Sequence, residues 1–500
     1  MMPCYLGIDL GTSGLKAALV RADGTILSIG YHGLGIDVPY PGFAQQNPDI
    51  WCEAARDAIA QAVQQAGIPA TNIRGIGFSG QMHGLVALGE DRKPLYPSII
   101  WCDQRSAKQS QRVRKDIGID QLGKWTQNAV CPGFQLSTIL WLRDEMPELY
   151  DQLRSVMLPK DYLRMCMTDE IATEPTDACS TLMYDCARQD WSEPLLNRFD
   201  IPDSILPDAK HRPYQTAGRL TAHAAEYFGL AEGTLVAFGG GDQPMQAIGN
   251  GILLPGDASL TLGTGGQIFV PTSAPVYDPI LRTHTFCHAP ENRWYVMGAT
   301  LGACLSQNWF LEKVLCTKDY KTLDAEASQV APGCEGLIFL PYLTGERTPH
   351  MDPQAKGVFF GLTLRHERAA MVRAVLEGVA FSLLDAMGVI TQLNLPIDRL
   401  ILAGGGATSS LWRQVIADVF HRPLYSSAMR EEAALGAAIC AMVACGEYAS
   451  LEEACGAIVR YEEEYVQPNE SRAEVYREQY ALFKDLYRVN APLMHQTGGI

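Results

Sequence analysis

The chain has 500 residues, a hydrophobic content of 47% and a formal net charge of −16 at neutral pH. This length predicts two to four domains of about 100–200 residues each. The negative charge argues against a broad nucleic-acid-binding face, which needs clustered lysine and arginine side chains. An anionic ligand is still compatible with this charge if backbone N–H groups or a metal ion attract it locally.

Cysteine usage and hydropathy indicate a cytoplasmic protein. The 14 cysteines contain no Cys-x-x-Cys pair, and so large a chain does not depend on disulfides, so we expect reduced thiols. No basic segment precedes the first strand, so we expect no signal peptide. The longest run without charged or strongly polar groups, residues 433–446, is only about 14 residues long, so we expect a buried helix and no membrane span.

In the first half of the chain, strand-like and helix-like runs alternate, which is typical of α/β layers. Residues 5–20 and 26–31 predict an antiparallel meander with a Gly-rich turn, and residues 49–65 have helical periodicity. Further strands are predicted over residues 73–78, 98–101 and 233–238.

The second half begins with a similar pattern. Residues 258–270 predict a strand, a Gly-Thr-Gly-Gly turn and a second strand, as in the opening hairpin. A long helix over residues 368–390 precedes a strand over 399–402 and the glycine run 404–406. Two similar hairpins about 250 residues apart suggest two related domains, with a boundary near residue 250. We expect the polar end, residues 491–500, to be a frayed tail.

The two Gly-Thr turns and the glycine run are candidates for a phosphate site. Glycine N–H groups and Thr or Ser hydroxyls can surround a phosphate without any positive charge. The alternative for either hairpin alone is a tight turn that only reverses the chain. No G-x-x-x-x-G-K-[ST] motif is present, which excludes a Walker-type site, and the opening turn joins two strands, which excludes a dinucleotide fingerprint.

Two aspartates follow glycine-rich strand ends. Asp9 could brace the first hairpin or hold Mg²⁺ against nucleotide phosphates. Asp242 could cap a helix, or it could accept a hydroxyl proton as the oxygen attacks a γ-phosphorus. Phosphoryl transfer needs positioning, charge neutralisation and one carboxylate near the nucleophile.

Two loops and a pair of histidines are the remaining candidates. Residues 80–84 and 101–105 carry Gln, His, Asp and Trp side chains, which suit a polyol, although ordinary loop packing with an Asp103–Arg105 ion pair is the alternative. His284 and His288 flank Cys287 in a β-branched, aromatic segment without carboxylates, so we interpret both as structural histidines rather than metal ligands.

Several of these stretches resemble the FGGY family of carbohydrate kinases. The matching stretches span nearly the whole chain, and the long block 340–350 is the most specific of them: Gly7–Gly14, Gly80–Gly84, Leu158–Tyr162, Gly239–Asp242, Leu340–His350, Gly357–Leu362 and Gly404–Ala407. The resemblance implies an α/β fold of two actin/ribonuclease-H-like domains (the ASKHA superfamily) with the active site between them. It divides the chain into a sugar-binding half (1–247), a nucleotide-binding half (248–485) and a tail (486–500).

The resemblance also implies roles for individual residues. Asp242 would be the catalytic base, Asp9 the Mg²⁺ neighbour, and ATP and Mg²⁺ the cofactors. The expected sugar-binding residues are Gln81, Met82, His83, Trp101, Asp103 and Gln243. The expected ATP-binding residues are Thr12, Ser13, Lys16, Thr264, Gly302, Gly405, Gly406, Ala407 and Ser410.

The implied activity is the ATP-dependent phosphorylation of a small ketose, D-xylulose foremost. Three departures from the pattern lie in the sugar half: Gln243 stands where many relatives have Asn, Gln127 where Gly is common, and Thr138 where Lys is common. They leave kinases of ribulose, fuculose or another polyol as alternatives, and a sugar-sensing ATP-binding module or an actin-like ATPase as the alternatives outside this class. The expected partners are the ketose and ATP, with no nucleic acid and no membrane, and a homodimer is among the assembly states that the sequence leaves open.

Overall fold

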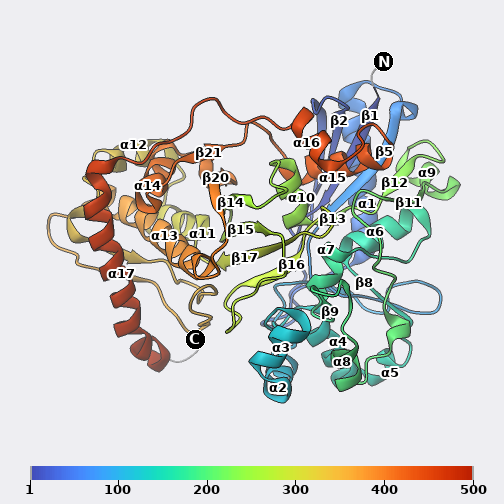
Figure 1. The fold of residues 1–500 in the computed structure, drawn as a ribbon, viewed down its shortest axis with the longest axis horizontal. Coiled ribbons are helices and arrows are strands. Elements are labelled where there is room, and N and C mark those ends of the chain that lie inside the picture. Colours follow the sequence, from blue (N-terminus) through green and yellow to red (C-terminus); the bar gives the residue numbers. More distant parts are fainter. Residues whose placement is uncertain (1–2, 498–500) are drawn as a thin grey trace.

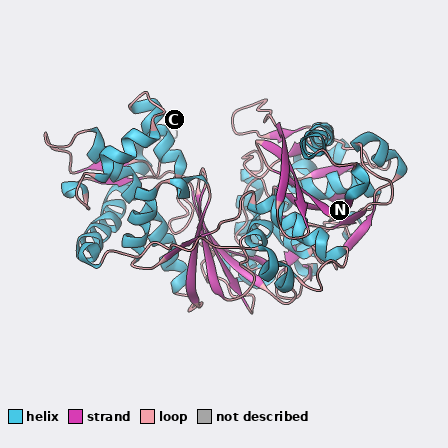
Figure 2. Cartoon of the chain, turned by 90° about the horizontal axis from the view of Figure 1, so that it is seen from above, coloured by secondary structure: helices cyan, strands magenta, loops and turns pink. Residues whose placement is uncertain are grey.

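The computed structural model describes residues 3–497 and forms two lobes, each built around its own β-sheet (Figure 1). Seen from above, the lobes lie side by side, and strands of the second sheet reach toward the first lobe (Figure 2). The N-terminal part of the chain forms one lobe, and the C-terminal helix lies on the outer side of the other.

The first sheet contains the expected opening meander. Its strand order is β11-β12-β5-β1-β2-β3, with β13 also paired to β5. β1 is antiparallel to β2 and parallel to β5, so the hairpin is extended by a strand that returns through a helix. The strands are β1 Cys4–Leu10, β2 Gly14–Arg21, β3 Ile26–Gly33, β5 Ile73–Gly80, β11 Thr216–Arg219, β12 Leu235–Ala237 and β13 Gly240–Gly241.

The second sheet repeats this arrangement, which confirms the prediction of two related α/β domains. Its order is β16-β17-β15-β14-β20-β21, in which β14 is antiparallel to β15 and parallel to β20. β14 and β20 therefore correspond to β1 and β5. The strands are β14 Gly256–Leu262, β15 Gly266–Thr272, β16 His284–Cys287, β17 Trp294–Thr300, β20 Ile397–Ala403 and β21 Leu424–Ser426.

Helices cover both sheets, and their ends follow ordinary capping rules. In α1, Asn47 accepts a hydrogen bond from the Asp49 amide at the N-terminus, and Gly67 ends the helix in the left-handed conformation. The helices of the first half are α1 Pro48–Ala66, α2 Ala107–Ile117, α3 Ile119–Thr126, α4 Gln135–Glu145, α5 Pro147–Tyr150, α6 Pro159–Thr168, α7 Pro175–Ala178, α8 Glu193–Arg198, α9 Ala222–Phe228 and α10 Asp242–Gly249. Those of the second half are α11 Cys304–Trp309, α12 Tyr320–Ser328, α13 Arg368–Thr391, α14 Ser410–Phe420, α15 Glu432–Ala444, α16 Leu451–Ile458 and α17 Ala473–Met494.

One helix, α13, is long and apolar enough to span a membrane by length and composition. However, 78% of its most apolar window is buried inside the protein. Its side chains form the core of the second lobe together with β14, β15 and α14. Its hydrophobicity is therefore that of a core helix.

Short two-stranded ribbons lie outside the two sheets. The strand expected over residues 98–101 is shorter than predicted, because only Ser98–Ile99 (β7) pairs, and its partner is β4 (Gln45–Gln46) rather than the first sheet. The other ribbon strands are β6 Val86–Leu88, β8 Ser155–Met157, β9 Tyr184–Asp185, β10 Asp190–Trp191, β18 Ile338–Leu340 and β19 Val358–Phe360.

The helix α15 leaves the second lobe and packs on the first sheet. It contacts β1 and β5 and lies beside α10, as Figure 1 shows. The expected nucleotide-binding half, 248–485, includes α15 and α16, whose side chains belong to the core of the first lobe.

Glycines allow this close approach of α15. A Cβ atom on Gly7 would lie 1.9 Å from the Ala434 carbonyl oxygen, and one on Gly77 would lie 1.9 Å from that of Ala437. Because both clashes would be with backbone atoms of one helix, no side-chain rotation can relieve them.

The expectation of a tail from residue 486 is wrong as far as the structure describes it. α17 continues to Met494 and a 3₁₀ turn follows over His495–Thr497. Leu486 and Met494 are buried against the second lobe, which holds this end in place. Residues 498–500 lie outside the described part of the chain.

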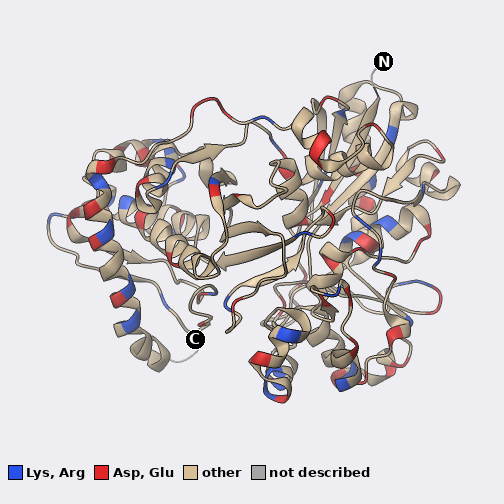
Figure 3. Ribbon diagram, in the orientation of Figure 1, with Lys and Arg blue, Asp and Glu red and all other residues tan. Residues whose placement is uncertain are grey.

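Lysine and arginine are interspersed with aspartate and glutamate on the same helices, most visibly along α17 (Figure 3). This mixture is typical of a solvated surface and differs from the clustered basic face that nucleic acid requires.

The close packing under α15 predicts the effect of enlarging Gly77. Gly77→Ala should lower the free energy of unfolding by about 1–3 kcal/mol or more, because the added methyl group meets a helix carbonyl. Thermal and urea unfolding would measure this loss. The matched control is Gly388→Ala in α13, where a Cβ meets nothing within 4 Å, and which should be neutral or stabilising by up to about 1 kcal/mol. Equal stability of Gly77→Ala and the wild type would contradict the packing argument.

Candidate active site

Three parallel strand ends bring the first-half candidates together. β1, β5 and β13 lie in register, with Asp9 beside Ser79 and with Gly240 and Gly241 beside Ser79 and Gly80. The carboxyl ends of parallel strands form one edge of a sheet, where ligands of α/β proteins commonly bind. Asp9, the loop after β5 and the start of α10 therefore meet at one place.

Asp242 is the first residue of α10, directly after β13. Burial, and to a smaller extent the nearby Asp9 carboxylate, raise the pKa of Asp242 to about 7, although hydrogen bonds from Gln243 oppose the shift. No Lys or Arg contributes to this shift. An unpaired carboxylate poised near neutral pH is suited to accepting a proton.

Asp9 lies at the end of β1 and shares this environment. The Ser79 hydroxyl donates to its Oδ1 at 2.7 Å. Burial raises the pKa of Asp9, while the Ser79 hydrogen bond and the Lys16 ammonium act in the opposite direction. Two nearby carboxylates repel each other when both are ionised. A hard divalent cation bound beside them would offset this repulsion.

A chain of hydrogen bonds joins the first Gly-rich turn to the loop after β5. The indole N–H of Trp101 donates to Thr12 Oγ1 at 2.9 Å, and that hydroxyl donates to Gln81 Oε1 at 3.2 Å. The Gln81 amide then donates to Gln46 Oε1 at 2.9 Å. The polar groups of Trp101 and Gln81 thus hold the first Gly-rich turn against the loop after β5.

Met82 and His83 lie beyond Gln81, under Asp242. Met82 is buried and would touch any Cβ placed on Gly241, and the Tyr295 hydroxyl of the second half lies 4.0 Å from its sulfur. The His83 ring stacks on Phe134 with centroids 3.6 Å apart.

The tautomer of His83 follows from its hydrogen bond. Burial lowers the pKa of His83 to about 3, so the ring is neutral at physiological pH. Its Nδ1 lies 2.9 Å from the Ser180 carbonyl oxygen, which can only accept, so we assign the proton to Nδ1. Nε2 then carries a lone pair and can accept a hydrogen bond from a substrate hydroxyl.

Asp103, a predicted sugar ligand, is fully buried in a different arrangement. Its Oδ2 accepts from the Ala44 amide at 2.6 Å and from Arg105 Nε at 2.8 Å, and its Oδ1 accepts from the Arg105 amide. These are the contacts of the ion pair given above as the alternative, and they leave Asp103 bracing the loop instead of facing the site.

The second-half candidates gather at the corresponding edge of the second sheet. Thr261 of β14 pairs with Ala403 of β20, so the turn with Thr264 and the glycine run both follow directly. The amides of Cys304 and Leu305, at the start of α11, donate to the Gly263 and Thr264 carbonyl oxygens at 3.0 Å.

The glycine run closes this edge. A Cβ on Gly406 would lie 3.1 Å from Cys304 Sγ, and one on Gly302 would lie 2.2 Å from the Pro341 carbonyl oxygen. Gly405 and Ala407 belong to a 3₁₀ turn, and Ser410 begins α14. The predicted ATP-binding residues of this half therefore lie near one edge of the second sheet, where Gly302 and Gly406 are buried and Gly405 and Ser410 are exposed.

One contact links the lobes at the site, and one ion pair joins the first hairpin to the residue before α15. The guanidinium of Arg347, from the block 340–350, lies 5.9 Å from the centre of the Trp101 ring. Lys16, a predicted ATP ligand, is paired with Glu431 at 2.5 Å, whereas Ser13 at the tip of the turn is exposed.

The comparisons with known proteins agree with this geometry. Models of the N-terminal and C-terminal domains of the FGGY family of carbohydrate kinases match residues 4–249 and 258–445. The chain belongs to the FGGY family of carbohydrate kinases. As a sugar kinase, it uses a sugar and ATP as its substrates.

Named relatives extend the match over nearly the full length. The chain is 36% identical to a xylulose kinase of Escherichia coli (strain K12), over 98% of this chain and 100% of that protein. A crystal structure of a xyloylose kinase from Brucella ovis is 32% identical, with a TM-score of 0.91 over 98% of this chain and 100% of the other. A gluconate kinase structure from Lactobacillus acidophilus is 25% identical, with a TM-score of 0.93 over 100% of both chains.

The departures from the FGGY pattern have structural roles here. Thr138 is buried in α4 and its hydroxyl donates to the Phe134 carbonyl oxygen at 3.0 Å. Gln127 ends α3 in the left-handed conformation, and its Oε1 accepts from the Ala187 amide at 3.2 Å. Gln243 directly follows Asp242, and hydrogen bonds from Gln243 oppose the raised pKa of that carboxyl group.

His284 and His288 are buried and neutral in this FGGY kinase. Burial lowers the pKa of His284 to about 3 and that of His288 to about 4. His284 Nδ1 lies 3.1 Å from Asn128 Oδ1, and His288 Nε2 lies 3.0 Å from the Ile252 carbonyl oxygen. These contacts agree with the interpretation of both as structural.

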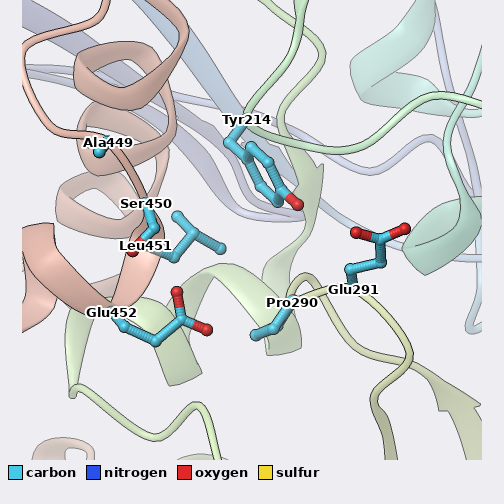
Figure 4. A pocket seen from close by; sticks show the side chains of 7 residues that line it. All are labelled: Tyr214, Pro290, Glu291, Ala449, Ser450, Leu451 and Glu452. Carbon is cyan, nitrogen blue, oxygen red and sulfur yellow. The ribbon is translucent and has the colours of Figure 1, made fainter.

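A cavity of about 250 Å³ lies away from the site, between α16 and the segment after β16 (Figure 4). None of the predicted site residues lines it. Its lining residues are Tyr214, Pro290, Glu291, Ala449, Ser450, Leu451 and Glu452.

A buried charged cluster under Asp242 was missed by sequence reasoning. Lys160 is fully buried and lies 2.6 Å from Asp161, 3.5 Å from Glu174 and 3.3 Å from Asp177. Burial alone would lower the pKa of Lys160, but the three carboxylates raise it above its ordinary value. The segment 158–162 had matched the FGGY pattern, but the acidic partners come from distant positions that no spacing reveals.

The cluster supports the strand end that carries Asp242. Glu174 Oε1 accepts a hydrogen bond from the Thr176 hydroxyl at 2.8 Å. Thr176 Oγ1 in turn accepts one from the Gly241 amide at 3.1 Å. A Cβ on Gly80 would lie 2.7 Å from Cβ of Lys160, so the lysine also touches β5.

Removing this buried cation should be strongly destabilising. Lys160→Met should lower the free energy of unfolding by about 3–5 kcal/mol, because three buried carboxylates lose their partner. Burial raises the pKa of Glu174 and that of Asp177, and the loss of Lys160 removes the opposing interaction. Acids with a raised pKa bind protons more tightly in the folded state than in the unfolded state. The difference in the free energy of unfolding between Lys160→Met and the wild type should therefore narrow as the pH is lowered from about 8 to 5.

Urea unfolding of the variant and the wild type at several pH values would measure this deficit. Lys16→Met is the matched control, since its half-exposed pair with Glu431 should contribute at most about 1 kcal/mol. A deficit that stays constant with pH would contradict the electrostatic explanation.

Proposed function

We propose that this kinase transfers the γ-phosphate of ATP to the 5-hydroxyl of D-xylulose, giving D-xylulose 5-phosphate in pentose catabolism. The observation that supports the sugar is the similarity to xylulose kinases over nearly the whole chain, together with Met82 against Gly241, the residue before Asp242. Localisation in the cytoplasm is part of this proposal.

Asp242 is the proposed catalytic base. Its carboxylate accepts the proton of the 5-hydroxyl, the oxygen forms a bond to the γ-phosphorus, and the bond from that phosphorus to the ADP oxygen breaks. The pKa of about 7 suits this task, because about half of the carboxyl groups are ionised at pH 7 and the carboxylate is basic enough to accept the proton.

The sugar would lie over Met82 and His83. Nε2 of His83 is the acceptor for one hydroxyl, and the Met82 side chain offers an apolar surface for C–H groups. Gln243 and Trp101 complete this set. We do not include Asp103, since its carboxylate is used within the loop.

ATP would bind between the two Gly-rich turns. Thr12, Ser13 and Lys16 belong to the first turn and its following strand. The second group comprises Thr264, Gly302, Gly405, Gly406, Ala407 and Ser410. Lys16 can reach a phosphate only by exchanging its Glu431 partner.

Asp9 is the residue that would hold Mg²⁺. The fit rests on two observations: Asp9 has an acidic neighbour in Asp242, and Ser79 engages only one of its carboxylate oxygens in a hydrogen bond. Bound there, Mg²⁺ would neutralise phosphate charge, which suits a protein with a net charge of −16.

A kinase for another ketose or polyol is the second candidate. Gln243 favours it, because this side chain is longer than the Asn of many relatives and hydrogen-bonds the proposed base directly. The fold likeness to a gluconate kinase shows that related scaffolds accept another acceptor class.

The substrate assignment is tested by a panel of acceptors with ATP and Mg²⁺. We expect the highest kcat/KM for D-xylulose among D-xylulose, ribulose, fuculose, glycerol and gluconate, with the phosphate at position 5 by NMR. ADP release without acceptor is the control for wasteful hydrolysis. A higher kcat/KM for any other acceptor would replace D-xylulose in this proposal.

The base is tested by Asp242→Asn and by pH. Wild-type kcat/KM should fall about tenfold per pH unit below about pH 7, because protonation removes the base. Asp242→Asn should lower kcat by about 10²-fold or more and lose this acid limb, while ATP binding is retained.

Stability separates this effect from misfolding. Because the pKa of Asp242 is raised in the folded state, its ionisation costs stability, so Asp242→Asn should melt no lower than the wild type at pH 8. Asp257→Asn, which alters a surface pair with Arg399, is the matched control and should keep wild-type turnover. Near-normal turnover of Asp242→Asn would remove Asp242 from the mechanism.

A further inference from the structure

Three cysteines that play no part in the proposed reaction converge in the interior. The sulfur atoms of Cys179, Cys186 and Cys287 all lie within 4.8 Å of one another, and all three residues are fully buried. They are free thiols. Together we call them the cysteine triad.

The triad joins the two halves of the chain. Cys179 begins the 3₁₀ turn after α7 and Cys186 follows β9, whereas Cys287 ends β16 of the second sheet. β16 contacts α7 and this turn, and the labels α7 and β16 are neighbours in Figure 1.

The backbone fixes the positions of the sulfurs. The Cys287 amide donates to Cys179 Sγ at 3.3 Å, and the Cys186 thiol lies 3.3 Å from the Thr285 carbonyl oxygen. The Cys186 carbonyl oxygen also accepts from the Trp294 indole at 2.7 Å. Each cysteine is therefore held on a segment that is anchored by other contacts.

We propose that the cysteine triad is a binding site for one soft d¹⁰ metal cation, such as Cu⁺ or Cd²⁺, held by three thiolates. A metal–sulfur bond of about 2.3 Å in a trigonal site places the sulfurs about 4 Å apart. The three sulfurs, all within 4.8 Å of one another, are already close to this geometry.

The donor set selects the kind of cation. Among residues 3–497, no His, Asp, Glu or further Cys offers a ligand atom within the same distance of all three sulfurs. A structural Zn²⁺ site is ordinarily closed by four ligands, whereas soft thiolates select Cu⁺. Binding of a divalent cation releases up to three protons and leaves one negative charge on the site.

A cation bound at the cysteine triad would change the position of His83, a proposed sugar-binding residue. Ser180 follows Cys179 directly, and it holds His83 through both its hydroxyl and its carbonyl oxygen at 3.1 and 2.9 Å. Movement of Cys179 Sγ onto a bound cation would displace the adjacent Ser180 and thereby His83. This consequence rests on the proposed function, but the binding itself does not.

Titration of the reduced protein with Cd²⁺ tests the site, with a reductant that contains no thiol. We expect one tightly bound Cd²⁺ per chain, with a thiolate-to-cadmium charge-transfer absorption and an increase in Tm. Both signals should be lost in Cys287→Ala and in Cys186→Ala.

The matched control is Cys166→Ala, which breaks the other close thiol pair, Cys52 with Cys166, and should leave the signals unchanged. Signals that survive in Cys287→Ala, or that vanish only in Cys166→Ala, would overturn the proposal.

A thiol count of the denatured protein tests whether two cysteines of the triad form a disulfide. We expect 14 reactive thiols. A count of 12 together with no Cd²⁺ binding would show a disulfide in the triad and would also overturn the proposal.

Kinase activity gives an independent measurement. At one equivalent of Cd²⁺, the KM for the sugar should rise in the wild type and not in Cys287→Ala. Unchanged kinetics with bound Cd²⁺ would remove the link to His83 and leave the metal site standing.

Discussion

The pairing of β13 with the end of β5 is the constraint on which the site depends. Gly240 and Gly241 enter the first sheet for two residues only, and the chain then turns into α10 at Asp242. This short pairing sets Asp242 at the same edge as Asp9 and Met82. The Lys160 cluster supports it from below through Glu174, Thr176 and the Gly241 amide, so buried charge is used here to hold a backbone position.

The two sheets explain how an acidic protein can use an acidic nucleotide. Each lobe ends a β-hairpin in a turn rich in Gly, Thr and Ser, and each turn lies beside a parallel strand that returns through a helix. Backbone amides and hydroxyls at these edges can neutralise phosphate locally, so the net charge of −16 is no obstacle.

The fold and the position of Asp242 at a strand end could be predicted from the sequence, because both leave local signals. Apolar runs with Gly-rich ends predicted both hairpins, and the glycines before Asp242 marked its strand end. The Asp103–Arg105 pair was visible as an alternative but could not be chosen without the Ala44 amide, which lies far away in the chain. The Lys160 cluster and the cysteine triad could not be found, because their members meet only after the chain folds.

The same limit applies to the ends of the domains. Local periodicity predicted a buried helix over residues 433–446 but not its location, since the glycines that receive it, Gly7 and Gly77, lie in the first sheet. The sequence did not predict that the helix continues beyond residue 486, because most of its side chains there are exposed or only partly buried. Leu486 and Met494 are the buried side chains that pack against the second lobe.

The path of α15 has a consequence for how the lobes are joined. The chain passes between the lobes three times: before β14, between β21 and α15, and between α16 and α17. Three connections restrict the relative motion of the lobes more than a single linker would. A single proteolytic cut would not separate the lobes, and a fragment ending near residue 250 would expose the glycine-lined face of its own sheet.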